Sequence, residues 1–201
     1  MLERPPGGAT QQPQPSGNVK GTLLIARMKF LRAQGKIEIE EVLRRLPSDD
    51  RGLLQGLLLP STWYPAELLM RLETAIAAVV ARGDRARAFT AMGRFAAQAN
   101  LGPGGVQRPY LREDDPHYLL ERLPRMYVSQ HTSGRRTYER IDERSATVRS
   151  FECEPHSDDC FFVVGWLQRA IELSGGNDVS VLETQCHARG APHCEYRARW
   201  S

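Results

Sequence analysis

The sequence predicts an α+β fold, in which a helical first half packs on a small antiparallel sheet of about four strands. Three observations predict it. Apolar residues recur at helical spacing from Lys20 to about residue 128. After Gly134 the apolar period changes to two, which is typical of strands. A strongly apolar helical segment then separates the second expected strand from the third.

The expected helices lie between capping residues and the glycines or prolines that end them. They cover residues 20–34, 38–46, 48–59, 65–82, 85–101, 117–128 and 160–174, with a possible break at Pro124 and a Gly/Pro-rich loop at 102–116. The expected strands are shorter and alternate apolar with polar residues. They cover residues 137–141, 147–151, 178–185 and 194–200.

Composition indicates one domain of ordinary globular character, with 41% apolar and 25% charged residues among 201. Residues 1–18 are rich in Pro, Gly and Gln, so we expect a flexible tail followed by a single domain over 19–201. No apolar run approaches the ~20 residues that span a bilayer, and the N-terminus lacks the apolar centre of a signal peptide. We therefore expect a cytoplasmic protein. The net charge of +3 is too small to indicate a nucleic-acid partner.

Three cysteines and a glutamate are candidates for a metal site, because reduced cysteines that cluster favour a metal over a disulfide scaffold. Cys186 and Cys194 flank the turn of the last expected hairpin. Cys160 is expected in the first turn of a helix, where the positive helix end favours a thiolate. Glu183 precedes Cys186 by three residues, so shared ligation requires a β-bulge or the end of the strand near Thr184.

The residues by themselves leave the ligand set open. Zinc takes four such ligands tetrahedrally, and a site made only of protein ligands is structural. Buried free thiols, or a disulfide between Cys186 and Cys194, are the alternatives to a metal. Three ligands would be the cysteines named above, and the fourth would be Glu183 or one of its replacements, Cys153, His187 and His193. Chemistry slightly favours Cys153, because a four-cysteine site is the more usual composition.

Two motifs in the last quarter of the chain are similar to those of a known family. They read Cys160-Phe-Phe-Val-Val-Gly165-Trp166-Leu and Glu183-x-x-Cys186-x-Ala-x-Gly190-x-x-x-Cys194-x-Tyr196. The segment resembles the 4-vinyl reductase domain, a small-molecule-binding module of regulators that sense aromatic compounds. The family shares its fold with TRAPP vesicle-tethering subunits and, more distantly, with haem-NO-binding domains. The resemblance is specific over residues 160–200, and before about residue 136 it extends only to a compatible order of helices.

The resemblance implies a structural zinc ion held by Cys160, Glu183, Cys186 and Cys194. It also implies a cavity between helices and sheet that takes a small apolar or aromatic molecule, or a lipid. Aromatic side chains suit the walls of such a cavity. The candidates are Trp63, Tyr64, Phe161, Phe162 and Trp166.

We expect no enzymatic activity, because a fully coordinated zinc ion leaves no position for a water nucleophile and no other reactive constellation is evident. Since no output domain is expected in the sequence, a signal would pass through association. The resemblance implies a homodimer formed through the helical half. The alternative is a TRAPP-like interaction scaffold whose core is filled by side chains or by a lipid.

The segment Tyr127-Val-Ser129-Gln-His131 resembles the Tyr-x-Ser-x-Arg run of haem-NO-binding domains. It carries a histidine where that run has its propionate-binding arginine. No proximal histidine is identifiable upstream of this segment. We therefore do not expect haem.

Overall fold

The computed structural model describes residues 17–81, 84–152 and 159–201. Short 3-10 turns occur at Arg108–Tyr110 and His187–Arg189. The helices and strands follow in the order β1 (Asn18–Lys20), α1 (Gly21–Gln34), α2 (Lys36–Arg44), α3 (Ser48–Gln55), β2 (Trp63–Pro65), α4 (Ala66–Val80), α5 (Arg85–Leu101), α6 (Pro116–Leu120), α7 (Leu123–Gln130), β3 (Arg135–Asp142), β4 (Ser145–Phe151), α8 (Asp159–Leu173), β5 (Ser180–Gln185) and β6 (Cys194–Arg199).

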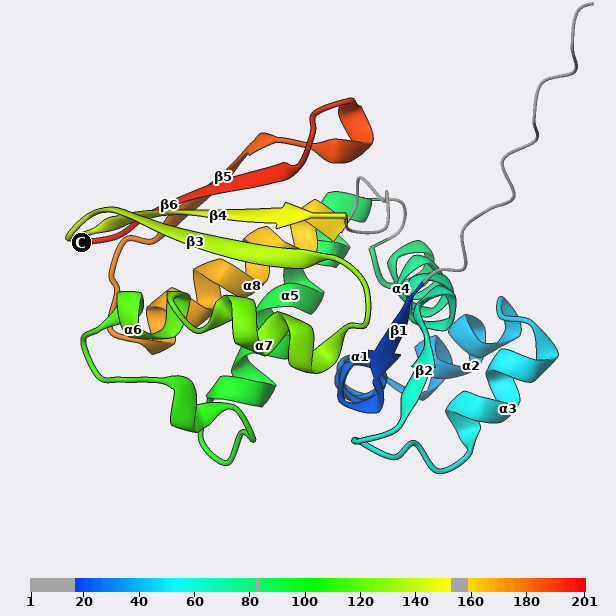
Figure 1. The fold of residues 1–201 in the computed structure, drawn as a ribbon. Helices are drawn as coiled ribbons and strands as arrows, with labels where there is room; N and C mark the ends of the chain where they lie inside the picture. Colours follow the sequence, from blue (N-terminus) through cyan, green and yellow to red (C-terminus); the bar gives the residue numbers. More distant parts are fainter. Residues whose placement is uncertain (1–16, 82–83, 153–158) are drawn as a thin grey trace, which may run out of the picture.

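The main sheet is antiparallel, with the strand order β3-β4-β6-β5. Helices α5, α6, α7 and α8 lie against one face of it, while α1 to α4 gather beside that layer (Figure 1). Helix α8 connects the second and third strands of this sheet in chain order. These features confirm the predicted α+β class and the predicted place of the last helix.

Several helices begin or end at the capping residues that the sequence predicts. The carboxylate of Asp84 accepts a hydrogen bond from the amide of Arg87 at 3.0 Å, which satisfies a free N–H at the start of α5. Gly35, with φ 137°, ends α1. The expected helix at 117–128 is two helices, α6 and α7, because Pro124 stands at the start of α7, where its missing N–H costs nothing.

The apolar interior consists of two clusters of buried side chains. One is formed by α1 to α4 with the first half of α5, and includes Phe89 and Met92. The other lies between the sheet and the helices α5 to α8, and includes Ala97 and Leu101 from the second half of α5. Helix α5 therefore belongs to both clusters and joins the two halves of the chain.

Helices α5 and α8 approach each other closely through two glycines. A Cβ atom at Gly93 would lie 2.1 Å from the carbonyl oxygen of Phe162, and one at Gly165 would lie 2.2 Å from that of Thr90. Neither distance is compatible with a side chain, so both positions require glycine. The crossing fixes α8, and with it Cys160, relative to the helical half.

A two-stranded sheet of β1 and β2 was not predicted. Its strands have three residues each, and Val19 also bridges to His131 after α7. Asn18 therefore belongs to β1, and of the tail expected at 1–18 only Gly17 and Asn18 lie among the described residues. Gly83 and Cys153 lie outside them. Within the described part of the chain, no helix combines the length and hydropathy needed to cross a membrane.

Candidate metal centre and adjoining cavity

Four potential metal ligands meet at the end of the sheet next to the start of α8. The Sγ atom of Cys160 is 3.5 Å from that of Cys194 and 3.8 Å from that of Cys186. One ligand atom from each of these residues and from Glu183 lies within 4.8 Å of all the others. Four ligands placed ~2.3 Å from a tetrahedral ion would be ~3.8 Å apart. The spacing of the protein atoms therefore suits a zinc-sized ion.

A β-bulge in β5 brings Glu183 to the same side of the sheet as the cysteines. Glu183 pairs with Tyr196 on β6, and Gln185 pairs with Glu195, so Thr184 is an extra residue in β5. The extra residue reverses the alternation that would otherwise place Glu183 and Cys186 on opposite faces. This is one of the two geometries that the sequence required for shared ligation.

The carboxylate of Glu183 is held at one oxygen and left open at the other. Its Oε2 accepts a hydrogen bond from Nη2 of Arg189 at 2.7 Å. Its Oε1 is buried and has no hydrogen-bond partner among the described residues. A buried oxygen without a partner is costly. A cation at the centre of the four residues would satisfy it.

The three thiols differ in acidity. The hydrogen bond from the Cys160 thiol, together with that from the amide of His187 at 3.3 Å, lowers the pKa of Cys194 to about 6. Donating that hydrogen bond raises the pKa of Cys160, as do its burial and the neighbouring carboxylate of Glu183. Burial and the neighbouring Glu183 raise the pKa of Cys186. Of these three cysteines, Cys194 therefore loses its proton most readily to form a thiolate.

The alternative fourth ligands do not join this group within the described residues. His187 is exposed, and its Nδ1 lies 2.9 Å from the carbonyl oxygen of Ala191. His193 is half-buried, and its ring centre lies 4.9 Å from that of Phe151. Cys153 is outside the described residues.

A cavity of about 180 Å³ adjoins the cluster, between the helical half and the sheet. Cys160 and Cys194 form part of its wall. Elements from both halves of the chain contribute the rest, among them α1, α4, α5, α7 and α8. Its apolar lining includes Leu23, Leu69, Leu123, Met126 and Val163.

Two of the five aromatic candidates, Phe162 and Trp166, line this cavity. The other three lie elsewhere. Trp63 on β2 is 41% exposed, with Nζ of Lys20 4.0 Å from its ring centre. Tyr64 is buried and its hydroxyl accepts a hydrogen bond from the amide of Leu59 at 3.1 Å. Phe161 packs against the helical cluster, because adjacent residues of α8 point about 100° apart.

Two charged residues of the cavity wall, Arg27 and Glu73, were not identified from the sequence. Tyr127 and His131, from the run that resembles the haem-NO-binding motif, also line the cavity, as does Arg136. Arg27 carries a detectable signal, since it is the one charged residue in the run Gly21–Met28 of a helix whose other residues there are apolar or small. A charge with no polar helix face to occupy indicates a buried partner.

Solved structures of similar fold include H-NOX proteins. The H-NOX protein from S. oneidensis, in its Fe(II)NO ligation state, has a TM-score of 0.69 at 14% sequence identity, over 90% of this chain and 99% of that chain. A mutant H-NOX protein from T. tengcongensis has a TM-score of 0.67 at 12% identity, over 90% and 97%. An unliganded Fe(II) protein from K. algicida has 0.63 at 11% identity, over 90% and 96%. At these identities the likeness shows a shared fold.

Residues 52–201 match the model of the family described as "Protein of unknown function (DUF2378)". The chain therefore belongs to that family. No curated protein matches it. The H-NOX likeness agrees with the distant relation expected from the sequence, while the matched family model does not carry the name of the 4-vinyl reductase domain.

Haem, which is named for another solved structure of similar fold, does not fit this cavity. Pockets for drug-sized ligands measure ~300–1,000 Å³, and a haem group is at least that large. The cavity here is about 180 Å³. Its histidine, His131, stands where the resembling run has a propionate-binding arginine, and its ring stacks on Tyr127 with centroids 4.1 Å apart.

Proposed function

We propose that this chain is a non-enzymatic sensor domain, related to the 4-vinyl reductase domain, that binds a small molecule between its helical half and its sheet. The observation that carries the proposal is the cavity, whose wall combines apolar side chains with a few polar ones from both halves of the chain. Such a lining is characteristic of small-molecule sites. The absence of enzymatic activity is part of the proposal, because the ligand cluster closes around an ion and leaves no position for a reacting water.

The cluster of Cys160, Glu183, Cys186 and Cys194 is proposed as a structural zinc site. The spacing of the four ligand atoms, all within 4.8 Å of one another, and the unpartnered Oε1 of Glu183 support it. The ion would join the start of α8 to β5 and β6, and so contribute to folding. Its chemistry there would be the neutralisation of thiolate and carboxylate charge.

Elemental analysis tests the zinc proposal. We expect one zinc ion per chain in the purified protein, and its loss in Cys186→Ser. Cys153→Ser is the matched control, and it should retain the metal. Zinc retained by Glu183→Gln but lost from Cys153→Ser would assign the fourth ligand to Cys153 instead.

Signal transmission is proposed to occur through a homodimer formed by the helical half. Large apolar side chains exposed between residues 37 and 63 support it, namely Ile37, Leu53, Leu57, Leu59 and Trp63. Exposed apolar groups that gather in one region favour a protein contact. Light scattering should give a dimer that Leu57→Ser weakens. Leu182→Ser, which alters an exposed leucine of the sheet, should leave the dimer unchanged.

Native and denaturing extraction with organic solvent separates the sensor from a TRAPP-like scaffold. A compound released only on denaturation, or a rise in melting temperature with small apolar ligands, supports the sensor. Protein that releases nothing and responds to no ligand would favour the scaffold.

A further inference from the structure

Arg27 is buried in the wall of the cavity with one donor unused. The residue is 4% exposed, and its Nε donates to Oε1 of Glu73 at 2.6 Å. Its Nη1 is buried and has no hydrogen-bond partner among the described residues. An unpaired guanidinium N–H inside a protein is costly, because it has lost its hydration without replacement. An acceptor within the cavity would restore the missing bond.

The guanidinium group is fixed in place from two sides. Glu73 on α4 holds its Nε, and the ring of Phe162 on α8 lies 3.9 Å from its Cζ. Stacking on an aromatic ring suits the planar arginine group. A donor that is already oriented loses little conformational freedom when it binds an acceptor.

Outside the candidate metal centre, the charges around the cavity favour a single negative group. Apart from the thiols of the candidate metal centre, its ionic residues are Arg27, Glu73 and Arg136. Glu73 offsets one of the two arginines. Arg136 donates from Nε to the hydroxyl of Ser150 at 3.2 Å, so it is also held at the wall. Outside that centre, one positive charge remains to be balanced.

The size of the cavity limits the ligand to about one ring. An engineered cavity of ~150 Å³ with apolar walls admits benzene, and the cavity here is about 180 Å³. We propose that the cavity binds a small monocarboxylate with a ring-sized apolar body, whose carboxylate accepts a hydrogen bond from Nη1 of Arg27. The apolar body would lie against Leu69, Met126 and Val163. This inference rests on the proposed sensor function and specifies its ligand.

Benzoate, benzamide and toluene form a probe series that separates charge from shape. Binding to the zinc-loaded full chain at pH 7.5 is measured by calorimetry, and native mass spectrometry first identifies any compound retained from expression. We expect benzoate to bind about ten- to a hundredfold more tightly than benzamide, the range of a charge-assisted hydrogen bond. A retained compound should be a carboxylic acid.

Variants at the ion pair test the role of Arg27 in both directions. Arg27→Lys keeps a cation beside Glu73 but removes the Nη1 donor, so the preference for benzoate over benzamide should fall to less than threefold. Glu73→Gln removes the competing carboxylate and should strengthen benzoate binding. Arg94→Lys is the matched control, because Arg94 pairs with Glu172 and does not line the cavity.

The failure of this inference and that of the sensor function give different results. Equal binding of toluene and benzoate would contradict the proposal that the ligand is a carboxylate, but not the sensor function. An unchanged preference for benzoate over benzamide in Arg27→Lys would do the same. A retained neutral compound does the same. Protein that holds no compound and binds none of the three probes overturns both.

Discussion

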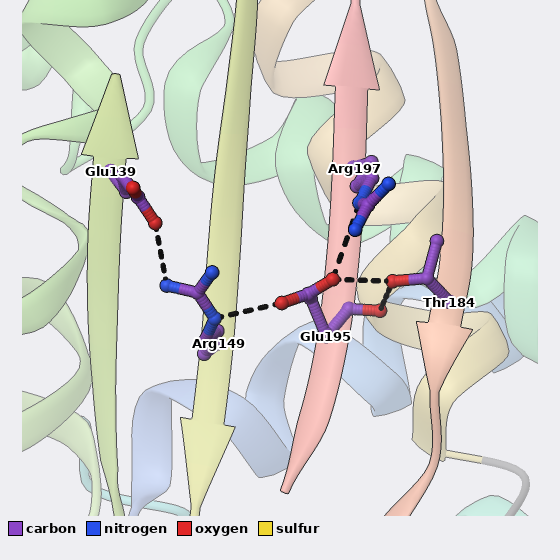
Figure 2. Close-up of polar contacts among 5 residues, drawn as sticks. All are labelled: Glu139, Arg149, Thr184, Glu195 and Arg197. Atoms are coloured by element: carbon purple, nitrogen blue, oxygen red, sulfur yellow. Dashed lines mark hydrogen bonds and ion pairs between the residues drawn. The ribbon is translucent and has the colours of Figure 1, made fainter. Parts of the chain in front are cut away.

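Two glutamates on neighbouring strands face opposite sides of the sheet and differ in how they are paired. On the outer face, Glu195 is 4% exposed and belongs to a network that crosses all four strands (Figure 2). Its Oε2 accepts from Arg149 at 2.8 Å, and its Oε1 accepts from Thr184 at 2.8 Å and from Arg197 at 3.2 Å. On the inner face, Glu183 has one buried oxygen with no such partner in the described chain.

The difference separates a structural carboxylate from a candidate ligand. Burial raises the pKa of Glu195, but the bonds from Thr184 and Arg149 outweigh it and hold the pKa below its ordinary value. The protein thus supplies everything that this charge needs. Oε1 of Glu183 and Nη1 of Arg27 have no such partner in the described chain, so only a bound ion or ligand would supply one. The unpartnered atoms of these two charged groups therefore point to the inner face as the functional side of the sheet.

The largest expected effect comes from removing a metal ligand on the inner face. Cys194→Ser should lower the free energy of unfolding of the zinc-loaded protein by about 4 kcal/mol or more, since metal binding contributes directly to folding. That corresponds to ~10 °C in melting temperature for a chain of this length. Calorimetry measures it, with Cys153→Ser as the control. Equal melting of wild type and Cys194→Ser would remove the structural role of the metal.

Acid should lower the free energy of unfolding through protonation of His131, which lines the cavity on the inner side of the sheet. Burial, and then the charges of Arg136 and Arg27, lowers the pKa of His131 to about 4. In the unfolded chain it titrates near 6.5. Stability is therefore fully present above pH ~6.5 and is lost as pH falls toward 4, by about 3 kcal/mol, because the unfolded state binds the proton first.

Urea denaturation between pH 7 and 4 measures this loss. His131→Gln should have a flatter profile, and His187→Gln, at an exposed histidine, should follow the wild type. Identical slopes for His131→Gln and wild type would show that other groups carry the acid sensitivity.

On the outer face, Glu195→Ala should cost about 2 kcal/mol, because it leaves Thr184 and two arginines without their shared acceptor. The cost should be the same with and without zinc. Glu183→Gln should destabilise only the zinc-loaded protein. Chemical denaturation of both variants with and without a chelator measures the contrast, and a zinc-dependent cost for Glu195→Ala would contradict it.

The crossing beneath the inner face is compared with an open helix position, where the smallest effect is expected. Gly165→Ala should cost about 3 kcal/mol or more, because its Cβ would meet the backbone carbonyl of Thr90 at 2.2 Å. Gly52→Ala in α3 is the control, where a Cβ meets nothing within 4 Å. It should stabilise the protein by up to ~1 kcal/mol. Thermal melts compare the two, and equal shifts would argue against a close crossing.

The sequence predicted the helices, the main sheet and the cysteine cluster because each has a local signal. The spacing of Cys186 and Cys194 around a turn is such a signal. The alternation of side chains along the strand required either a bulge or the end of the strand near Thr184, and the structure has the bulge. The pairing of Arg27 with Glu73 could not be predicted, because 46 residues separate them and only packing brings them together. Strands as short as β1 and β2 leave no alternation to detect.

Helix α5 shares its residues between the two apolar clusters, and the cavity lies where those clusters meet. Phe162 packs with the first and Trp166 with the second, and both reach the cavity wall. Such clusters tend to open as separate cooperative units. A molecule bound between the two clusters would contact both cooperative units and hold them together. Binding in the cavity would then raise the free energy needed to open α1 to α4. A second copy of the chain that contacts these helices would respond to that change even if the sheet did not move.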